Sequence, residues 1–417
     1  MQEPGRLQAV IDILTEIHDT PQAADRYLEK WARGNRYAGS KDRRAISEAV
    51  YQVLRNRRFL SHAVSDDSPR LVALASYHLL HGHSIEDISA MADGGKFGPA
   101  VLQDEERNAL IASSAVVSTV ASSTDDSQKA IRFSVPEWAE ADMRAALGDT
   151  FDANAEMLLE RAPLDIRVNT LKASSEQVQA TLAEEEILVS PVEGIATALR
   201  VTQGRNIMQT ELYKDGSIEV QDAGAQLTSL LCHVKRGMTV LDYCAGAGGK
   251  ALAMAAQMEH HGRVFVHDDD RRRLKPLWER AKRAGTELIE LARDLPELEN
   301  SLDLVVVDVP CSGSGRWRRN PETKWQMDPK ALEDLCALQA KILKQALKYV
   351  RPGGCLVYIT CSILDCENKA QADKFVAENE GFAYDTQGAG LEHGFRQLSP
   401  AGNATDGLFI ASFQRLT

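Results

Sequence analysis

Hydrophobic residues recur at spacings of three and four through residues 1–112, as in AVIDILTEI (9–17) and AISEAVYQVLRNRRFL (45–60). This period is that of amphipathic helices, and almost no segment of the region alternates as a half-buried strand does. Residues 113–127, SSAVVSTVASSTDDS, are rich in Ser and Asp and poor in large side chains, which predicts part of a connector. We therefore predict an all-helical first domain over residues 1–127.

The next region mixes helical and strand-like segments. After FSVPEW (133–138), LDIRVNT (164–170) and ALRVTQ (198–203) have the composition of strands, and the helical SSEQVQATLAEEE (174–186) lies between them. We predict a small α/β subdomain over residues 128–217.

From residue 218 to 417, a helical segment, DAGAQLTSLLCHV, leads into short apolar runs that alternate with helices. The runs are TVLDYC (239–244), RVFVHD (263–268), ELIEL (287–291), LDLVVVDV (302–309), CLVYITCS (355–362) and GLFIASFQR (407–415). Apolar strands that alternate with helices predict a mostly parallel sheet covered on both faces. The predicted fold class is therefore α/β, with a helical domain in front.

Composition narrows the class of protein. The 417 residues are 44% hydrophobic and 26% charged, as in soluble globular proteins, and no apolar run approaches the ~20 residues of a membrane span. The first twenty residues lack the basic and apolar regions of a signal peptide, so we expect a cytoplasmic protein. The net charge of −12 does not itself indicate a nucleic-acid binder, yet residues 26–58 hold ten Lys or Arg against three acidic residues.

The seven cysteines form no CxxC pair, and their odd number argues against a disulfide framework. No spacing resembles a zinc site and no His accompanies them, so we expect no metal. Four of them fall within helix or strand patterns and are predicted to be small buried hydrophobes: Cys232, Cys244, Cys336 and Cys355.

A strand, a glycine-rich turn and a helix follow one another in LDYCAGAGGKALAMAAQM (241–258). Glycines allow close backbone approach, and a helix N-terminus offers free N–H groups, although such a turn often serves packing only. Asp268 ends the next run, where a carboxylate can bind both ribose hydroxyls, whereas Asp269 and Asp270 suit a solvated turn. Because the dinucleotide and phosphate-loop motifs are absent, a nucleoside without pyrophosphate fits better, and S-adenosylmethionine is the commonest such cofactor on this architecture.

Two cysteines each follow a predicted strand. LDLVVVDV delivers Asp308 and Cys311 to the C-terminal edge of the sheet, and CLVYITCS delivers Cys361 to the same edge. A thiolate that adds to carbon 6 of cytosine makes carbon 5 nucleophilic, and a second group must then help remove the C5 proton. One reacting thiol and one assisting thiol suit that chemistry.

These motifs resemble a known family. DVPCSGSGRWRRNPETKW (308–325), YITCSILDCEN (358–368) and DYCAGAGGK (242–250) are similar to those of the RNA (cytosine-C5) methyltransferases of the Sun/RsmB type. NRYAGSKDRRAISEAVYQVLR (35–55) resembles that family's NusB-like N-terminal domain. The resemblance implies a Rossmann-like class I methyltransferase core, with a mostly parallel seven-stranded sheet over residues 218–417, and S-adenosyl-L-methionine as cofactor.

Residue by residue, the resemblance implies that Cys361 is the nucleophile, that Cys311 assists product release, and that Asp308 and Lys250 complete the catalytic set. The implied cofactor residues are Cys244, Ala245, Gly246, Ala247, Gly248, Gly249, Lys250, Asp268, Asp294 and Asp308. The chain departs from the family pattern twice. Ala247 stands where a Pro is common, and Leu291 stands where many members have an adenine-binding Asp, so Asp294 is a substitute.

Basic and aromatic residues follow Cys311 closely. The combination suits an RNA with a splayed cytosine, since cations contact phosphates and aromatic rings stack on bases. The predicted RNA-binding residues are Arg316, Arg318, Arg319 and Lys324, with Trp317 and Trp325 among them, and Arg43 and Arg44 in the basic helical stripe. A solvated loop and a solvated helix face are the plainer alternatives.

The leading hypothesis is therefore cytosine-C5 methylation of RNA by a monomer. The resemblance implies small-subunit ribosomal RNA, whereas the pocket motifs would serve equally for transfer RNA. A DNA methyltransferase would use the Pro-Cys thiol as nucleophile and would not need Cys361. A non-catalytic ribosome-assembly factor and a thiol oxidoreductase are further alternatives, and the latter lacks a CxxC motif.

Overall fold

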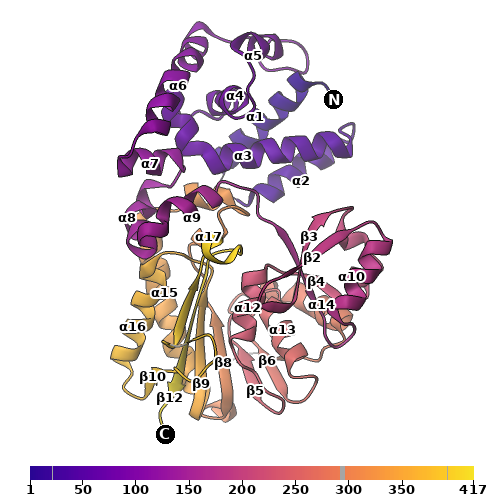
Figure 1. Cartoon of the computed structure of the whole chain (residues 1–417), viewed down its shortest axis with the longest axis vertical. Coiled ribbons are helices and arrows are strands. Elements are labelled where there is room, and N and C mark those ends of the chain that lie inside the picture. The colour runs from indigo at the N-terminus through magenta and orange to yellow at the C-terminus, as the bar shows by residue number, and fades with distance from the viewer. Residues whose placement is uncertain (21, 292–295, 392) are drawn as a thin grey trace. The chain divides into compact units, whose positions relative to one another are not determined.

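The computed structural model describes residues 1–20, 22–291, 296–391 and 393–417, and the chain forms two compact units. We call residues Met1–Arg161 with Arg316–Pro329 the helical unit, and residues Ala162–Gly315 with Lys330–Thr417 the sheet unit. Figure 1 shows the elements of both. Each unit is built from segments that are distant in sequence.

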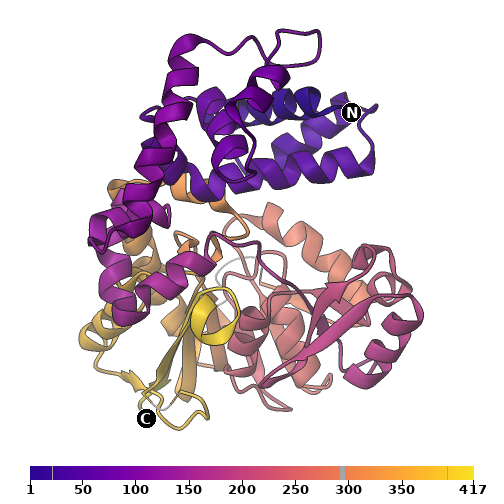
Figure 2. The same cartoon turned by 45° about the horizontal axis from the view of Figure 1, so that its top comes forward.

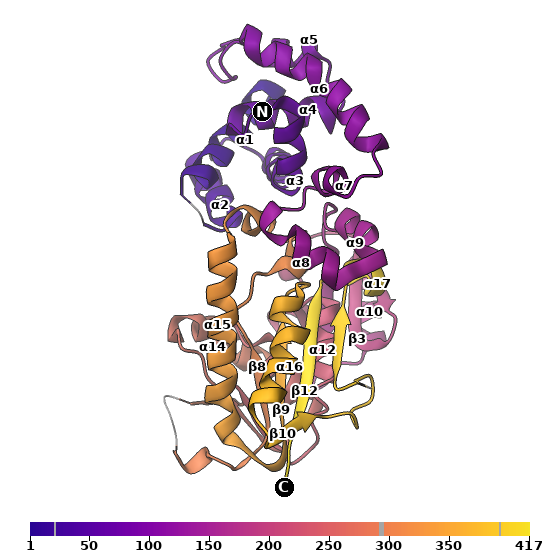
Figure 3. The same ribbon diagram turned by 90° about the vertical axis from the view of Figure 1, so that its left-hand side faces the viewer.

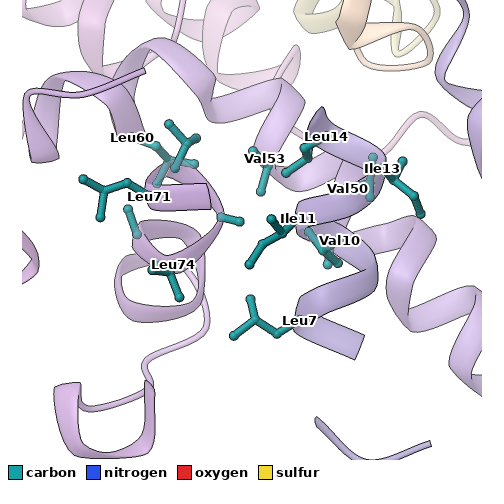
Figure 4. Packing of buried hydrophobic residues seen from close by; sticks show 14 of the residues in the cluster. Leu7, Val10, Ile11, Ile13, Leu14, Val50, Val53, Leu60, Leu71 and Leu74 are labelled. Atoms are coloured by element: carbon teal, nitrogen blue, oxygen red, sulfur yellow. The ribbon is translucent and has the colours of Figure 1, made fainter. Parts of the chain in front are cut away.

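The helical unit has the helices that the period of three and four predicts. They are α1 (Glu3–Asp19), α2 (Ala24–Gly34), α3 (Ser40–Val64), α4 (Pro69–Leu79), α5 (Ile85–Met91), α6 (Asp104–Ser122), α7 (Asp126–Arg132), α8 (Glu137–Leu147) and α9 (Phe151–Met157). Figure 4 shows how Leu7, Val10 and Leu14 of α1 pack near Val53 of α3 and Leu74 of α4. Burial of these apolar faces, rather than helix propensity, stabilises such a bundle.

The prediction of a connector over residues 113–127 is wrong for residues 113–122, which continue α6. Gln103 and Glu106 form a capping box at the start of this helix, and Leu110, Ser113 and Val120 are buried along it. Small side chains line this part of α6, so its hydrophobic period is weak in the sequence. The structure also places α8 and α9 in the helical unit, which therefore extends past residue 127 to Arg161.

A segment after the Cys311 motif, residues 316–329, completes the helical unit, and we call it the strap. Figure 2 shows it in orange beside the purple helices. Trp317 is fully buried, with its ring 5.8 Å from that of Trp138 in an edge-on arrangement. The indole of Trp325 donates to the carbonyl of Leu54 at 2.7 Å, and that of Trp138 donates to the carbonyl of Lys324 at 2.9 Å. The strap thus forms part of the interior of the helical unit.

The sheet unit begins with a small antiparallel sheet in the order β2-β3-β1-β4. Its strands are β1 (Leu164–Val168), β2 (Leu188–Val192), β3 (Ile195–Gln203) and β4 (Ile218–Val220). Helix α10 (Ser175–Glu184) packs Val178 and Leu182 against Ile166 and Val168 of β1, and α11 (Glu211–Lys214) leads into β4. This sheet is the small α/β piece that the sequence predicts.

The large sheet has the strand order β10-β12-β9-β8-β5-β6-β7, with β11 paired to β12 outside that path. The strands are β5 (Thr239–Asp242), β6 (Arg263–Val266), β7 (Ile289–Glu290), β8 (Leu302–Asp308), β9 (Val350–Thr360), β10 (Phe382–Tyr384), β11 (Phe395–Leu398) and β12 (Leu408–Arg415). The pairings from β9 through β7 are parallel, and those of β12 are antiparallel. The predicted Rossmann-like, mostly parallel sheet is therefore confirmed, although β11 gives the described sheet eight strands where seven were predicted.

The remaining helices of the sheet unit are α12 (Ala223–Leu230), α13 (Gly249–Gln257), α14 (Lys275–Ala284), α15 (Pro329–Ala346), α16 (Lys369–Glu378) and α17 (Pro400–Asn403). Helices cover both faces of the large sheet, and Figure 3 shows the two on one face, α15 and α16. Successive residues of a strand point to opposite faces. Accordingly Val305 and Val307 of β8 pack with α15 and α16, whereas Leu304 and Val306 pack with α13 and α14. Burial on both faces explains why β8 is apolar almost throughout.

Within the described ranges, no helix is long and apolar enough to cross a membrane. The same residues contain no cluster of three or more His, Cys, Asp or Glu that could hold a metal ion.

The burial of Trp317 predicts that Trp317→Ala destabilises the helical unit by about 3–5 kcal/mol, since it leaves a large cavity. Denaturant unfolding followed by helical circular dichroism measures this change. Tyr37→Ala is the control, because Tyr37 is an aromatic residue of the same unit that is 70% exposed, and its loss should change stability by no more than about 0.5 kcal/mol. Equal stability of the two variants would contradict a structural role for the strap.

Candidate active site

The glycine-rich turn joins β5 to α13 at the C-terminal edge of the large sheet. Gly246 and Gly248 have φ of +48° and +80°, which favour glycine. A Cβ on Gly248 would lie 2.4 Å from Cδ1 of Leu277, so this glycine serves the close packing of α14 on the turn. A Cβ on Gly246 would lie 3.2 Å from the guanidinium of Arg273. Close packing thus explains why position 248 is a glycine, whereas Gly246 lies next to the charged side chain of Arg273.

Asp268 follows β6 and contacts the same turn. Its carboxylate accepts hydrogen bonds from the backbone N–H groups of Gly246 (3.0 Å) and Asp270 (3.1 Å) and pairs with Arg273 at 3.1 Å. The Asp268 side chain is only 4% exposed, whereas Arg273 is half-exposed. The carboxylate therefore links the glycine turn to the end of the neighbouring strand, and its predicted role at the ribose stays a prediction. Asp269 is an exposed side chain, in keeping with its prediction as a turn residue.

The turn is also braced at Ala247, where the family commonly has Pro. Arg280 of α14 donates to the carbonyl oxygen of Ala247 at 2.6 Å and pairs with the buried Glu219 of β4 at 3.1 Å. The ion pair fixes the guanidinium, which in turn fixes the loop carbonyl. Leu291 is buried at the end of β7, and the predicted adenine contact Asp294 lies outside the described residues.

The structure brings the two predicted thiols together. Cys311 follows β8 and Cys361 follows β9, and their Sγ atoms are 3.0 Å apart. The backbone N–H of Cys361 also donates to Sγ of Cys311 at 3.2 Å. Both residues have intermediate exposure.

Hydrogen bonds join the two loops that carry the thiols. The hydroxyls of Ser314 and Ser362 are 2.9 Å apart, and the N–H of Ile363 donates to the Ser314 hydroxyl at 3.0 Å. These three residues are fully buried. The separation of the sulfur atoms therefore depends on a network of buried polar contacts as well as on the sheet.

An ion pair lies at the same edge. Nζ of Lys250, at the start of α13, is 2.5 Å from a carboxylate oxygen of Asp308 at the end of β8. Burial favours the neutral lysine, but the charges of Asp308 and Asp242 outweigh it and raise the pKa of Lys250 above its ordinary value. The charge of Cys361 acts on Lys250 in the same direction. Lys250 is thus a cation close to the nucleophile candidate.

Two further acids belong to the site that the sequence did not single out, Asp242 and Glu367. Asp242 ends β5 and is buried, and burial together with the charge of Asp308 raises its pKa to about 7. Glu367 lies in the 3₁₀ turn Asp365–Glu367 and binds Ser312, the residue after Cys311. The position of Asp242 at the end of a short apolar strand could have identified it as a site residue. No comparable sequence pattern surrounds Glu367.

Of the four cysteines predicted to be buried, only Cys232 is buried, whereas Cys244, Cys336 and Cys355 have intermediate exposure. Cys232 is buried, its thiol donates to the carbonyl of Thr228 at 3.3 Å, and burial raises its pKa to about 12. Burial also raises the pKa of Cys355 to about 11 and that of Cys244 well above its ordinary value. These thiols stay protonated at neutral pH, so they are poor nucleophiles.

The predicted RNA-binding residues divide into two groups. Arg43, Arg44 and Arg316 are exposed and Arg319 is partly exposed. Arg318 and Lys324 are instead buried inside the helical unit, 2% and 1% exposed. Nζ of Lys324 donates to the carbonyls of Arg55 (3.2 Å) and Ser134 (3.3 Å). We therefore assign Arg318 and Lys324 to the interior of the helical unit and exclude both from the proposed RNA surface.

A glycine turn after the first strand of a mostly parallel sheet, with an acid after the second strand, is the arrangement of Rossmann-like nucleotide-binding folds. Comparison with known proteins gives the family. The model of the "16S rRNA methyltransferase RsmB/F" family matches residues 229–414, and the model of the "Methyltr_RsmF/B-like, ferredoxin-like domain" matches residues 135–208.

Two relatives match most of the length of this chain. A "Ribosomal RNA small subunit methyltransferase B" of Enterobacter sp. is 30% identical over 291 residues, which are 69% of this chain and 67% of that protein. A "Probable ribosomal RNA small subunit methyltransferase B" of Synechocystis sp. is 28% identical over 437 residues, 95% of each chain. The chain therefore belongs to the RsmB/F methyltransferase family. It is an enzyme that acts on RNA, and its cofactor is S-adenosyl-L-methionine.

Solved structures share the fold. The crystal structure of PH0851 aligns with a TM-score of 0.77 and 23% identity over 100% of this chain and 99% of that one. A methyltransferase homologue from Pyrococcus horikoshii aligns with a TM-score of 0.61 and 24% identity over 70% of this chain and all of that one.

The raised pKa of Asp242 has a consequence for stability. Its folded value of about 7 exceeds the 3.8 of an ordinary Asp, so the protonated carboxyl stabilises the folded protein fully below about pH 4, and this stabilisation is lost as the pH rises from 4 to 7. We expect Asp242→Asn to be more stable than the wild type at pH 8, by up to about 4 kcal/mol, with the difference vanishing near pH 4. Denaturant unfolding across this pH range measures the effect.

Asp303→Asn is the matched control, because Asp303 is a carboxylate of the same sheet with a pKa shifted the other way. Burial would raise that pKa, but hydrogen bonds from the N–H of Thr239 and from Arg351 outweigh burial and lower it. Asp303→Asn should therefore lose stability at pH 8. If Asp242→Asn lost stability equally at every pH, the pKa of Asp242 would not be raised in the folded protein.

Proposed function

We propose that this enzyme methylates carbon 5 of a cytosine in small-subunit ribosomal RNA through a covalent adduct on Cys361. The observation that carries the proposal is the 3.0 Å contact between the sulfur atoms of Cys311 and Cys361 at the sheet edge that also bears the glycine turn. Cytosine C5 needs a nucleophile at C6 and a second group for elimination, and two adjacent thiols supply both.

The residues at the edge fit the cofactor. S-adenosyl-L-methionine supplies an activated methyl group when bound. Residues 244–250, from Cys244 to Lys250, would hold it with backbone groups of the turn and the start of α13. Asp268 would accept hydrogen bonds from ribose hydroxyls, because a carboxylate has about four acceptor sites and the half-exposed Arg273 can move aside. Asp308 would lie between the methionine moiety and the base.

Cys361 is the better nucleophile of the pair on electrostatic grounds. Two thiols in contact cannot both ionise readily, so one of them takes the charge. The hydrogen bond with Cys361, followed by burial, raises the pKa of Cys311 well above its ordinary value. Cys311 therefore remains a thiol that can donate to a Cys361 thiolate, and the cation of Lys250 favours the same charge.

The reaction then divides between the two sulfurs. The Cys361 thiolate forms a bond to C6. The C5–C6 double bond breaks, and its electron pair makes C5 nucleophilic toward the methyl group. As the adduct forms, the Cys311 thiol gives its proton to ring nitrogen N3, so Cys311 is a thiolate once C5 has received the methyl group. Cys311 then takes the C5 proton, the electron pair of the C5–H bond reforms the double bond, N3 releases its proton to solvent, and Cys361 leaves as a thiolate. Asp308 and Lys250 hold the polar edge of the site in place, since each neutralises the other.

The substrate RNA must present an unstacked cytosine, because a base in a duplex cannot reach a thiol. Supporting the choice of ribosomal RNA are the names of the relatives and the family model. Exposed arginines of the helical unit, Arg43, Arg44, Arg316 and Arg319, would contact phosphates.

Two cysteine variants test this division of labour. Cys361→Ala should abolish methyl transfer, by about 10³-fold or more, while S-adenosylmethionine affinity by calorimetry stays within about twofold. Cys311→Ala should also stop turnover but accumulate a covalent enzyme–RNA complex, because the adduct forms and does not resolve. The measurements are methyl transfer to small-subunit ribosomal RNA and to transfer RNA, with nucleoside mass spectrometry and denaturing gels.

The control is Cys232→Ala, since Cys232 is a buried packing cysteine of the same unit. It should retain methylation and form no complex. Near wild-type turnover by Cys361→Ala would overturn the nucleophile assignment. A methylated transfer RNA with unmodified ribosomal RNA would overturn the substrate, and 5-methylcytidine should be the product found.

A further inference from the structure

Glu367 is a fully buried carboxylate in the sheet unit that the reaction scheme does not use. It accepts hydrogen bonds from the N–H of Ser312 (2.8 Å), the hydroxyl of Ser312 (2.5 Å) and the amide of Gln339 (2.9 Å). The two carboxyl oxygens thus share three contacts, two of them with Ser312.

These contacts converge on the loop of Cys311. Ser312 follows Cys311 directly, and the amide of Gln339 that binds Glu367 also donates to the carbonyl of Pro310 at 3.0 Å. The residues on both sides of Cys311 are therefore held by one buried network. Tyr358 of β9 adds to it, since its hydroxyl donates to the backbone carbonyl of Glu367 at 2.6 Å.

The two thiols have different electrostatic surroundings. The titratable groups that act on Cys311 are Cys361 and Glu367, with the neutral phenol of Tyr358 beside them. Next to Cys361 lie Cys311 and the cation of Lys250, which is paired with Asp308. The negative charge of Glu367 near Cys311, compared with the neutralised pair of Lys250 and Asp308 near Cys361, distinguishes two side chains of identical chemistry.

We propose that Glu367 is a positioning residue that fixes the Cys311 loop and, through its negative charge, keeps Cys311 protonated so that Cys361 carries the thiolate. The proposal rests on the proposed function only in taking Cys361 as the nucleophile. Glu367 touches neither RNA nor cofactor in this scheme and acts through the loop and its field.

The test follows the ionisation of Cys311 directly, without RNA. In a full-length Cys361→Ser protein, a hydroxyl remains beside Cys311 and only Cys311 of the pair can be alkylated. Iodoacetamide labelling from pH 6 to 10.5, quantified by peptide mass spectrometry, gives the pH midpoint of Cys311. Adding Glu367→Gln, which keeps the shape and an acceptor oxygen, should lower that midpoint by about one unit and speed labelling about tenfold below it.

Two control variants distinguish an effect of the Glu367 charge from an effect on folding. Glu322→Gln neutralises a buried carboxylate of the helical unit and should leave the midpoint in place. Ser312→Ala removes the 2.5 Å hydroxyl contact but keeps the charge of Glu367, so its midpoint should shift much less than that of Glu367→Gln. A purely structural role would alter melting temperature and not the midpoint.

An unchanged midpoint in Glu367→Gln would overturn the proposal. If that variant failed to fold, the Cys361→Ser protein alone would still decide, since a Cys311 midpoint at or below the ~8.5 of an ordinary thiol contradicts a nearby buried charge. Neither result depends on methyl transfer, so failure here is distinguishable from failure of the Cys361 assignment.

Discussion

The parallel pairing of β8 with β9 is the constraint on which the site depends. Asp308 pairs with Ile359 across the two strands, and the N–H of Val309 donates to the carbonyl of Ile359 at 3.1 Å. This register places the residues that follow both strands at one edge, where Cys311 and Cys361 come into contact. A one-residue slip would exchange the faces of the apolar side chains, so burial on both faces of the sheet preserves the register.

The strap follows the Cys311 loop directly in the chain. At Arg316, shortly after Cys311, the chain joins the helical unit, and at Lys330 it returns to the sheet unit. Trp317 and Lys324, which resembled an RNA-binding surface in sequence, are interior residues of the helical unit. Burial lowers the pKa of Lys324 to about 7, aided by the charge of Arg55. Removing residues 1–127 would expose these side chains. A loss of RNA binding in the truncated protein would therefore not distinguish a lost docking surface from a disrupted helical unit.

Much of this arrangement could be predicted from sequence because it follows from local patterns. Short apolar runs predicted the strands β5, β6, β8, β9 and β12. The positions of Asp268, Asp308 and the two thiols at or just after the ends of these runs predicted that they lie at one edge of the sheet. The error over residues 113–122 arose because small side chains in α6 give a weak period. The burial of Lys324 depends on contacts with residues nearly 200 or more positions away, and Glu367 on Ser312 and Gln339, so no local pattern could reveal either.

The central claim is that two thiols share one pyrimidine and that Cys361 attacks it. Incubating the enzyme and cofactor with RNA that contains 5-fluorocytosine tests it most directly, because fluorine at C5 cannot leave as a proton does and the adduct persists. Digestion and peptide mass spectrometry then identify the linked residue. The account predicts a nucleotide on Cys361, lost in Cys361→Ala. A nucleotide on Cys311 that survives Cys361→Ala would contradict it.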